Sequence, residues 1–482
     1  MKTKQNYLSQ RAQRTQSLIF IFLCGLCVLG GEQFKLCFAD EPLANANLEG
    51  LYAKSIEQVL RLSPEQIDTG TAALIVSEAW SDMVAGRRYQ QQLDDIATEI
   101  RSRLKAKDTP MGAAAIPVIN DYLFNELKFK AINKATDPYD LFLHSVMDRR
   151  QGYCLSLSVL YLAVGERLGL PLYGVVVPGH FFVRYDDGHV RFNIETTAKG
   201  SSAADDYYIR EFNVPQNNTT IYMANLNKRQ TLGCFFNNLG NVYGAINNVD
   251  QAIASLQWAV YINPSLAESR INLGNNYMLK NRVDDAITEY QAAVKINPDN
   301  AKAHSNLANA YQKREWFNDA INEYTAAIKL DRSMAETYLG MGLCYNKLNQ
   351  PDSEIDAYLK ALAINPNMFE ALANLGGVYF NKGDYDAAIE QYNKAARVNP
   401  ANAGLYYQLG AAYSNKGDYE NTVKACLKAV ELDPKMADAH YGLAFAYYKL
   451  KNYDLAMEHI KTAEKLGKTI DQNLLKAIEN KI

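Results

Sequence analysis

The C-terminal half of the chain is organised by a pattern of apolar and small residues that recurs every 34 residues, from about residue 233 to residue 468. Early in each unit an apolar residue, a Gly or Ala, and a Tyr keep a fixed spacing, as in Leu239-Gly240-Tyr243. The end of the period is marked by Pro264, Pro298, Pro366, Pro400 and Pro434, and Arg332 takes the remaining place. Seven units fit this register without an insertion. Each unit has the length of two short helices that cannot bury their apolar face alone, so we expect the units to stack on their neighbours.

The period and the signature resemble those of the tetratricopeptide repeat (TPR), a helix-turn-helix unit. The resemblance implies an all-α TPR superhelix, right-handed, over residues 226–482, with the seven repeats at about 233–470 and a C-terminal cap helix. It also implies a scaffold that binds a protein or peptide partner, because the first helices of successive units line a concave groove.

Asparagine recurs at one position of these groove-lining helices, at Asn238, Asn272, Asn306 and Asn374. An amide side chain donates and accepts hydrogen bonds at once, which suits contact with a peptide backbone of any sequence. The Asn-Leu-Gly-Asn sequence that begins at Asn238 and at Asn272 resembles the TPR superhelix of O-linked N-acetylglucosamine transferase. In that superhelix a ladder of asparagines holds an extended peptide. The competing interpretation is that these residues are ordinary TPR packing and solvated surface.

The region before the repeats changes its pattern along the chain. Apolar residues at helical spacing predict helices between residue 48 and about residue 150, for example over 73–80 and 93–100. The run 155–168 is long and apolar enough for a buried helix, and Gly169 and Pro171 follow it as helix stops. Three β-rich runs come next, at 172–177, 180–185 and 190–195. We therefore expect an α+β domain over residues 40–225.

The last two β-rich runs are separated by a segment that contains Asp187-Gly188, a dipeptide typical of a two-residue hairpin turn. With this turn, Phe181 lies opposite Ile194, and His180 lies opposite Glu195. Side chains directly opposite each other have Cβ atoms roughly 5 Å apart, so the carboxylate can accept a hydrogen bond from the imidazole. A shift of one residue would place the two on different faces.

A cysteine at the start of the buried helix completes a possible catalytic set. A helix N-terminus and a nearby imidazolium both favour the thiolate of Cys154, which is the nucleophilic form. His180 would pair with the thiolate and protonate the leaving group, and Glu195 would orient the imidazole. Gln151 is a candidate donor to the oxyanion, and Asn193 is the alternative to Glu195 as the orienting group.

The order of helix cysteine, strand histidine and strand acid resembles the transglutaminase-like superfamily, which is related to papain. More narrowly, Arg149-Arg150-Gln151-Gly152, Arg167-Leu-Gly-Leu-Pro171 and Pro178-Gly-His-Phe-Phe-Val-Arg184 are similar to a bacterial branch that often precedes TPR units. The resemblance implies amide chemistry on a cysteine: proteolysis, deamidation or acyl transfer. Many members of that branch lack the cysteine and are presumed inactive. This chain keeps Cys154, but it has Glu195-Thr196-Thr197 where the superfamily more often has Asp-Pro-Thr.

Charge and composition exclude other classes of function. The chain has 482 residues with 50 basic and 53 acidic side chains, a net charge of −3, and the two signs are interspersed. A nucleic-acid partner is not expected, because binders of the phosphate backbone cluster their Lys and Arg residues. The remaining histidines are scattered without ligand spacing, so we predict no metal and no cofactor.

The N-terminus predicts export. Basic residues from Lys2 to Arg14 precede an apolar run over 18–29, which is shorter than the about 20 residues of a membrane span. We expect a signal peptide or an N-terminal anchor over residues 1–39, with cleavage after Ala39 or, as a second choice, after Ala46. The membrane is then a partner only if this segment stays uncleaved. An oxidising compartment would cap or pair Cys154 unless the site protects it.

Two functions remain open from the sequence. The first is an exported cysteine protease, amidase or acyltransferase whose TPR groove recruits a polypeptide. The alternative is a non-catalytic TPR scaffold or assembly protein with a degenerate transglutaminase-like domain. A weaker idea, cleavage of peptidoglycan peptides, rests on fold analogy alone.

Overall fold

The computed structural model describes residues 53–81, 83–215 and 220–482. The predicted leader over residues 1–39 lies outside these ranges, so the structure does not bear on it. Within the described ranges, no helix combines the length and the apolar character that crossing a membrane requires.

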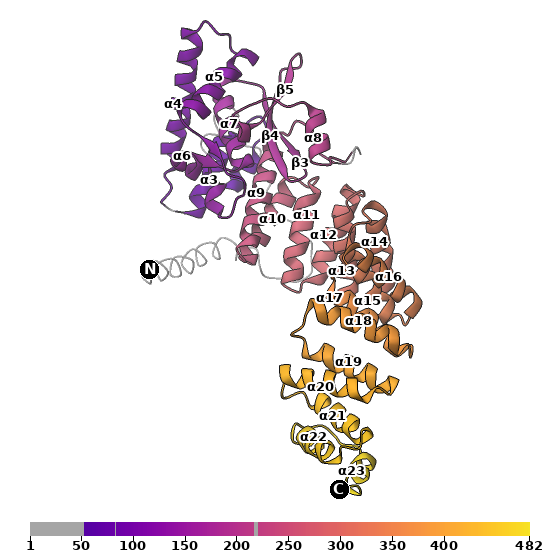
Figure 1. Cartoon of the computed structure of the whole chain (residues 1–482). Coiled ribbons are helices and arrows are strands. Elements are labelled where there is room, and N and C mark those ends of the chain that lie inside the picture. The colour runs from indigo at the N-terminus through magenta and orange to yellow at the C-terminus, as the bar shows by residue number, and fades with distance from the viewer. Residues whose placement is uncertain (1–52, 82, 216–219) are drawn as a thin grey trace. The chain divides into compact units, whose positions relative to one another are not determined.

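The region before the repeats is a mixed helix and strand domain (Figure 1). Its α-helices are α2 (Ile56–Arg61), α3 (Thr69–Trp80), α4 (Gly86–Ala106), α5 (Ile116–Asn120), α6 (Leu143–Arg149), α7 (Cys154–Leu168) and α8 (Asp205–Glu211). Single turns of other helix types lie at η2 (Ala113–Ala115), η3 (Asp121–Glu126), η4 (Pro138–Asp140) and η5 (Thr196–Ala198). The strands are β1 (Lys130–Ala131), β2 (Gln151–Gly152), β3 (Leu172–Val177), β4 (His180–Asp186) and β5 (Arg191–Ile194).

Helix α7 is the centre of this domain. Nearly all of its side chains are buried, as expected for a helix that is apolar on every side. It packs against α3, α4, α6 and the strands β3 and β4. The helix ends at Gly169, whose φ of 73° is the left-handed conformation that glycine adopts without steric cost. The helix predicted over 155–168 is therefore present.

Strands β3, β4 and β5 form an antiparallel sheet in that order, and β1 pairs with β2 in a separate short parallel ladder. Pro178 and Gly179 make the two-residue turn between β3 and β4, with Gly179 at a φ of 75°. This turn makes His180 the first residue of β4, paired with Val177. On the other side of β3, Gly174 forms an isolated antiparallel β-bridge with Leu226, which lies just before the first repeat helix.

The predicted register of the β4–β5 hairpin is wrong by two positions. Val183 pairs with Ile194, and Asp186 pairs with Arg191, so four residues rather than two connect the strands. The side chain of Asp187 stabilises this longer loop by accepting hydrogen bonds from the backbone N–H groups of His189 and Val190. Because a shift of two keeps the alternation of faces, His180 and Glu195 still share a face, as diagonal neighbours.

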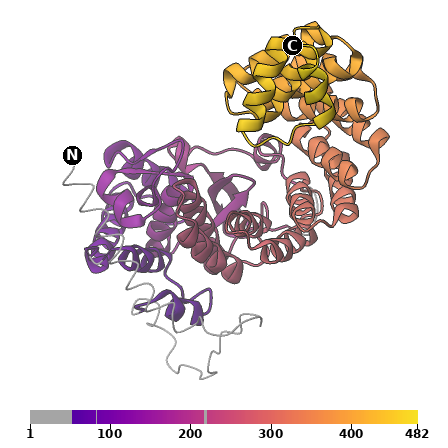
Figure 2. The ribbon, with the colours of Figure 1, turned by 90° about the horizontal axis from the view of Figure 1, so that it is seen from below.

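Seven consecutive helix pairs follow in the described part of the chain (Figures 1 and 2). The pairs are α9 (Lys228–Ala245) with α10 (Val249–Ile262), α11 (Ala267–Leu279) with α12 (Val283–Ile296), α13 (Ala301–Lys313) with α14 (Phe317–Leu330), α15 (Ala335–Lys347) with α16 (Pro351–Ile364), α17 (Phe369–Asn381) with α18 (Tyr385–Val398), α19 (Ala403–Lys416) with α20 (Tyr419–Leu432), and α21 (Ala437–Lys449) with α22 (Tyr453–Lys465). Helix α23 (Gln472–Glu479) follows and packs on α22.

The small residue of the repeat signature allows the two helices of a pair to approach closely. A Cβ atom added at Gly376 would lie 2.6 Å from the ring of Tyr392, and one at Gly342 would lie 2.4 Å from the ring of Tyr358. Both tyrosines are almost fully buried. In these units the glycine of the signature therefore makes room for a large side chain of its partner helix.

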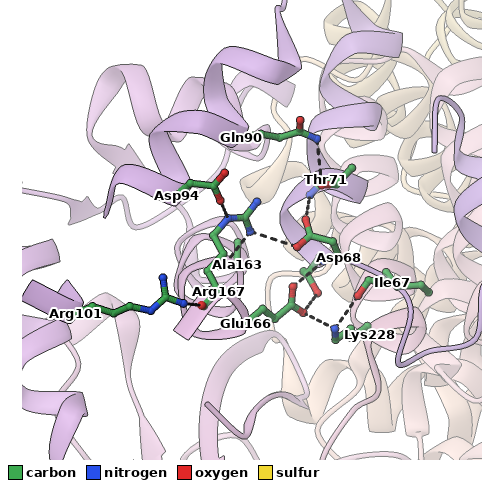
Figure 3. Close-up of polar contacts among 11 residues, drawn as sticks. Ile67, Asp68, Thr71, Gln90, Asp94, Arg101, Ala163, Glu166, Arg167 and Lys228 are labelled. Carbon is green, nitrogen blue, oxygen red and sulfur yellow. Dashed lines mark hydrogen bonds and ion pairs between the residues drawn. The ribbon is translucent and has the colours of Figure 1, made fainter. Parts of the chain in front are cut away.

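The first repeat helix is anchored to the domain by polar contacts as well as by packing. Lys228, the first residue of α9, donates to the carbonyl of Ile67 and forms an ion pair with Glu166 of α7. Figure 3 shows these contacts beside the guanidinium of Arg167, which donates to Asp94 and Asp68. These bonds join α9 to the end of α7 and to the start of α3.

Candidate functional site

Cys154 is the first residue of α7 and is 5% exposed. The start of this helix is held by Ser156, whose hydroxyl accepts from the backbone N–H of Tyr153 and donates to the carbonyl of Asp140. The thiol therefore lies in the first turn of a long buried helix, where the helix dipole favours an anion.

His180 lies between two of the predicted partners. One ring nitrogen, Nε2, is 2.7 Å from Oε2 of Glu195, and the side chain of Cys154 lies close enough to the imidazole to raise its pKa. The structure thus brings Cys154, His180 and Glu195 together, in the order that the sequence suggested. The contact between His180 and Glu195 forms despite the wrong register, because diagonal neighbours on one face of a sheet are within reach of long side chains.

Glu195 is fixed by residues whose contribution the sequence did not indicate. Its Oε1 accepts from the backbone N–H and the hydroxyl of Thr197, and its Oε2 also accepts from the hydroxyl of Tyr208 at 3.2 Å. Tyr208 comes from α8 and is fully buried. Phe212 stacks on the imidazole of His180, with ring centroids 4.9 Å apart and planes 4° apart. In the sequence, these contacts are signalled only by the presence of aromatic residues, Tyr208 and Phe212, after the two predicted strands.

The electrostatics of the set favour a charged pair. Burial lowers the pKa of His180, but hydrogen bonds to Cys154 and Glu195 outweigh this effect and raise it to about 9. Burial raises the pKa of Glu195, and its hydrogen bond with His180 and those with Thr197 reverse this, so that its pKa is lower than usual. At neutral pH the imidazole is therefore protonated and flanked by an ionised carboxylate, the state in which it stabilises a thiolate.

Tyr153 also touches the thiol. Its hydroxyl forms a hydrogen bond with the side chain of Cys154, and burial together with that contact raises the pKa of Tyr153 to about 12. The phenol remains a hydrogen-bond donor at neutral pH and adds a second donor beside the sulfur.

Cys154 and His180 open into a pocket with a volume of about 170 Å³. One wall comes from the domain and includes Val176, Gly179 and Phe181. The other wall comes from the first two repeats. Its residues on α9 and α11, with the loop between the two repeats, are Cys234, Asn237, Asn238, Asn241, Leu266, Glu268 and Asn272. The repeat array therefore supplies about half of the surface around the candidate nucleophile.

Two other predicted residues lie apart from this pocket. Gln151 belongs to the short strand β2 and is not among the residues that line the pocket. Asn193 accepts from Arg184 and donates to Ala203 and Asp205, so its amide is used in a buried network rather than at His180. Of the two orienting groups considered from the sequence, Glu195 is the one in contact with the imidazole.

The four asparagines predicted to bind peptide are half-buried on the first helices of their pairs. Asn238 donates to the carbonyl of Cys234 in its own helix. Asn272 donates to the side chain of Asn237, and Asn306 donates to the side chain of Asn275, so that both link neighbouring repeats. Asn238 and Asn272 also line the Cys154 pocket, whereas Asn306 and Asn374 do not.

Comparison with protein-family models gives two matches. Residues 87–230 match the model described as the transglutaminase-like superfamily. Residues 248–477 match the model of the cilia and flagella-associated protein 70 C-terminal domain, a TPR region. The boundary between the two matches falls inside the first helix pair.

Among curated proteins, the chain is similar to a UPF0162 protein of Xylella fastidiosa, with 34% identity over 121 residues, which is 24% of this chain and 42% of the relative. It is also similar to the F-box only protein 21 of Mus musculus, with 41% identity over 76 residues, which is 15% of this chain and 12% of the relative. The chain therefore spans less than half the length of the curated relatives it matches.

Two solved structures are similar to parts of the chain. A crystal structure of MamA shares 31% identity and covers 36% of this chain and 93% of its own, with a TM-score of 0.34. YrrB, described as a TPR protein with an unusual peptide-binding site, shares 24% identity and covers 38% of this chain and 95% of its own, with a TM-score of 0.35.

Proposed function

We propose that this chain, a transglutaminase-like domain followed by a TPR array, binds a polypeptide and carries out thiol-based amide chemistry on it at Cys154. The observation that supports this most directly is that His180 contacts Glu195 and lines, together with Cys154, a pocket shared with the array. A core cysteine needs neither a charged imidazole nor an opening to solvent.

The proposed reaction begins with attack of the Cys154 thiolate on the carbonyl carbon of an amide. A carbon–sulfur bond forms, and the imidazolium of His180 gives its proton to the nitrogen as the carbon–nitrogen bond breaks. The product is a thioester on Cys154 and a free amine. Water then gives hydrolysis, or an amine gives acyl transfer, with His180 taking the proton of the incoming group. Glu195 keeps the imidazole oriented throughout.

The test is the pH dependence of alkylation of Cys154 by iodoacetamide in the full-length protein, followed by peptide mapping. An activated thiol reacts quickly even where an ordinary thiol, with a pKa of about 8.5, is protonated. We expect such labelling in the wild-type protein and its loss in His180→Ala. The variant His304→Ala is a matched control, because His304 also contacts a glutamate, Glu323, but lies in the array.

The second candidate is a non-catalytic assembly protein that holds partners with both regions. The burial of the thiol favours it, because Cys154 is 5% exposed and a substrate carbonyl must reach the sulfur. Slow labelling of Cys154 that does not respond to His180→Ala would refute the catalytic proposal and leave this one.

We also propose that the protein is exported. The support is the basic and apolar pattern of residues 2–29. N-terminal sequencing of the protein from its own cell would test it, with processing after Ala39 or Ala46 as the expected result and an intact leader in the cytoplasmic fraction as the contrary one.

A further inference from the structure

Glu268 stands out among the residues that the array contributes to the pocket. It is the second residue of α11, and its carboxyl oxygen Oε2 is buried without a hydrogen-bond partner among the described residues. Its other contact is with its own backbone N–H. Burying a carboxyl group without a partner costs free energy that a packed protein normally avoids.

Glu268 is half-buried, and so is the acid at the same position of the last repeat, Asp438, but Asp438 forms an ion pair with Lys468. Glu336 and Glu370 are the second residues of α15 and α17, and both are exposed to solvent. An acid at this place stabilises the N-terminus of a helix, which accounts for its presence in all four units. Helix stabilisation does not require burial, and only at Glu268 among these four does the acid line this pocket.

No Lys or Arg is among the described residues that line the pocket, and its cationic side chain is the imidazolium of His180. Burial raises the pKa of Glu268 to about 7, and its own backbone N–H is the opposing influence. About half of the molecules therefore carry the carboxylate at neutral pH, and a cation bound beside it would favour that form. A pocket of about 170 Å³ is comparable to a cavity that admits one small ring, so it accepts a single side chain.

We propose that Glu268 binds a basic side chain of the polypeptide ligand, and that the first two repeats thereby select positively charged segments for the Cys154 pocket. The ligand class is a peptide that presents an ammonium or a guanidinium group. This inference deepens the proposed function, because it names the segment that is presented to the thiol. Glu268 is a specificity residue in this proposal, and it takes no part in bond making.

The experiment measures binding of three N-acetylated and C-amidated pentapeptides in which Lys, Arg or norleucine is flanked by glycines. Calorimetric titration of the full-length protein compares the wild type with Glu268→Gln and with the matched control Glu336→Gln. We expect the basic peptides to bind about tenfold more tightly than the norleucine peptide, the effect of one charge-assisted hydrogen bond. The preference should disappear in Glu268→Gln and persist in Glu336→Gln.

Equal affinities in the wild-type protein, or a preference that survives in Glu268→Gln, would overturn the inference. Glu268→Ala repeats the comparison if the glutamine variant folds poorly, as judged by circular dichroism. The measurement does not need a reactive thiol. A selective pocket with an unreactive Cys154 would therefore support the cation site and refute the catalytic proposal, whereas a reactive Cys154 without selectivity would do the reverse.

Discussion

The core of the domain and the core of the distal repeats are built on different plans. One continuous set of buried apolar residues runs from Val59 in the domain to Leu266 at the end of the first repeat. Beyond it, the buried residues of the array divide into separate clusters that each join two to four neighbouring elements, such as the cluster around Ala320 and Tyr324. The first repeat is thus part of the domain's core, although its sequence marks it as part of the array.

This difference predicts which parts of the molecule unfold cooperatively. A repeat that contacts only its neighbours gains stability from local interfaces, and its unfolding need not spread. Residues that share one core open together. The catalytic candidates and the part of the pocket wall from α9 belong to elements of this shared core, whereas α11 packs in the next cluster.

The largest expected effect comes from truncating one large buried side chain in the core shared by the domain and the first repeat, and one in the distal repeats. Phe235 of α9 is 1% exposed and lies in the shared core, and Leu443 of α21 is fully buried in the last pair. Truncation of either to Ala should lower the free energy of unfolding by about 3 to 4 kcal/mol. In Phe235→Ala, hydrogen exchange should accelerate in α3, α7 and β4 as well as in α9. In Leu443→Ala, it should accelerate only from about α20 to α23.

Mass-spectrometric hydrogen exchange under native conditions checks both variants together. Faster exchange confined to α9 and α10 in Phe235→Ala would break the comparison, because it would show that the first repeat unfolds without the domain.

A second prediction compares two histidine–glutamate pairs, one in each region. Nε2 of His180 lies 2.7 Å from Glu195, and Nδ1 of His304 lies 2.6 Å from Glu323. The pKa of His180 is raised to about 9, and the hydrogen bond to Glu323 raises that of His304. Only His180 has a thiol as its other partner. Cys154→Ala should therefore lower the pKa of His180 and leave that of His304 unchanged, as followed by NMR titration of the ring protons.

The same shift predicts a pH dependence of stability. The folded-state pKa of His180 lies above the usual 6.5, so its stabilising contribution is present below pH 6.5 and is lost as the pH rises through about 9. The contribution is roughly 3 kcal/mol from a shift of this size. The difference in the free energy of unfolding between wild type and His180→Gln should shrink by that amount between pH 6 and pH 10, as measured by denaturant titration. A constant difference would contradict the charged pair.

The smallest expected effect concerns the asparagines of the array. Asn306 donates to Asn275 of the preceding repeat at 2.9 Å, so Asn306→Ala should cost about 1 kcal/mol, the net value of one hydrogen bond. Asn374 has no such bond in the structure, and Asn374→Ala should change the unfolding midpoint little. Urea titrations of the two variants would check both predictions, provided that the free energy of unfolding falls with urea concentration at the same slope in each. A larger loss in Asn374→Ala would contradict a purely local role for these bonds.

The fold was predicted best in the array, where the same 34-residue pattern is repeated. The 34-residue period determines both the helix pairs and the close approach of small residues to large ones, because every unit meets the same neighbour. The period could not reveal that a carboxyl oxygen at position 268 is buried without a partner among the described residues. Burial there depends on what the domain places against α11, and the equivalent Glu336 and Glu370 obey the same sequence rule in solvent.

In the domain, the sequence indicated the catalytic candidates but not all of their geometry. The alternation of apolar residues placed His180 and Glu195 on one face, which the structure has. The turn was misplaced because Asp187 uses its side chain to close a longer loop, an option that the dipeptide Asp-Gly does not exclude. The contact of Tyr208 with Glu195 joins segments that no local pattern relates.

The sharing of the pocket wall by α9 and α11 has a consequence for the exchange of modules between proteins. Recombination that joins this domain to a foreign array at residue 226 would replace half of the pocket along with the array. A crossover placed after Ile296, the end of α12, would keep both the pocket and the second helix pair whole. Lineages that vary the array while keeping the site should therefore carry their breakpoints beyond the second repeat.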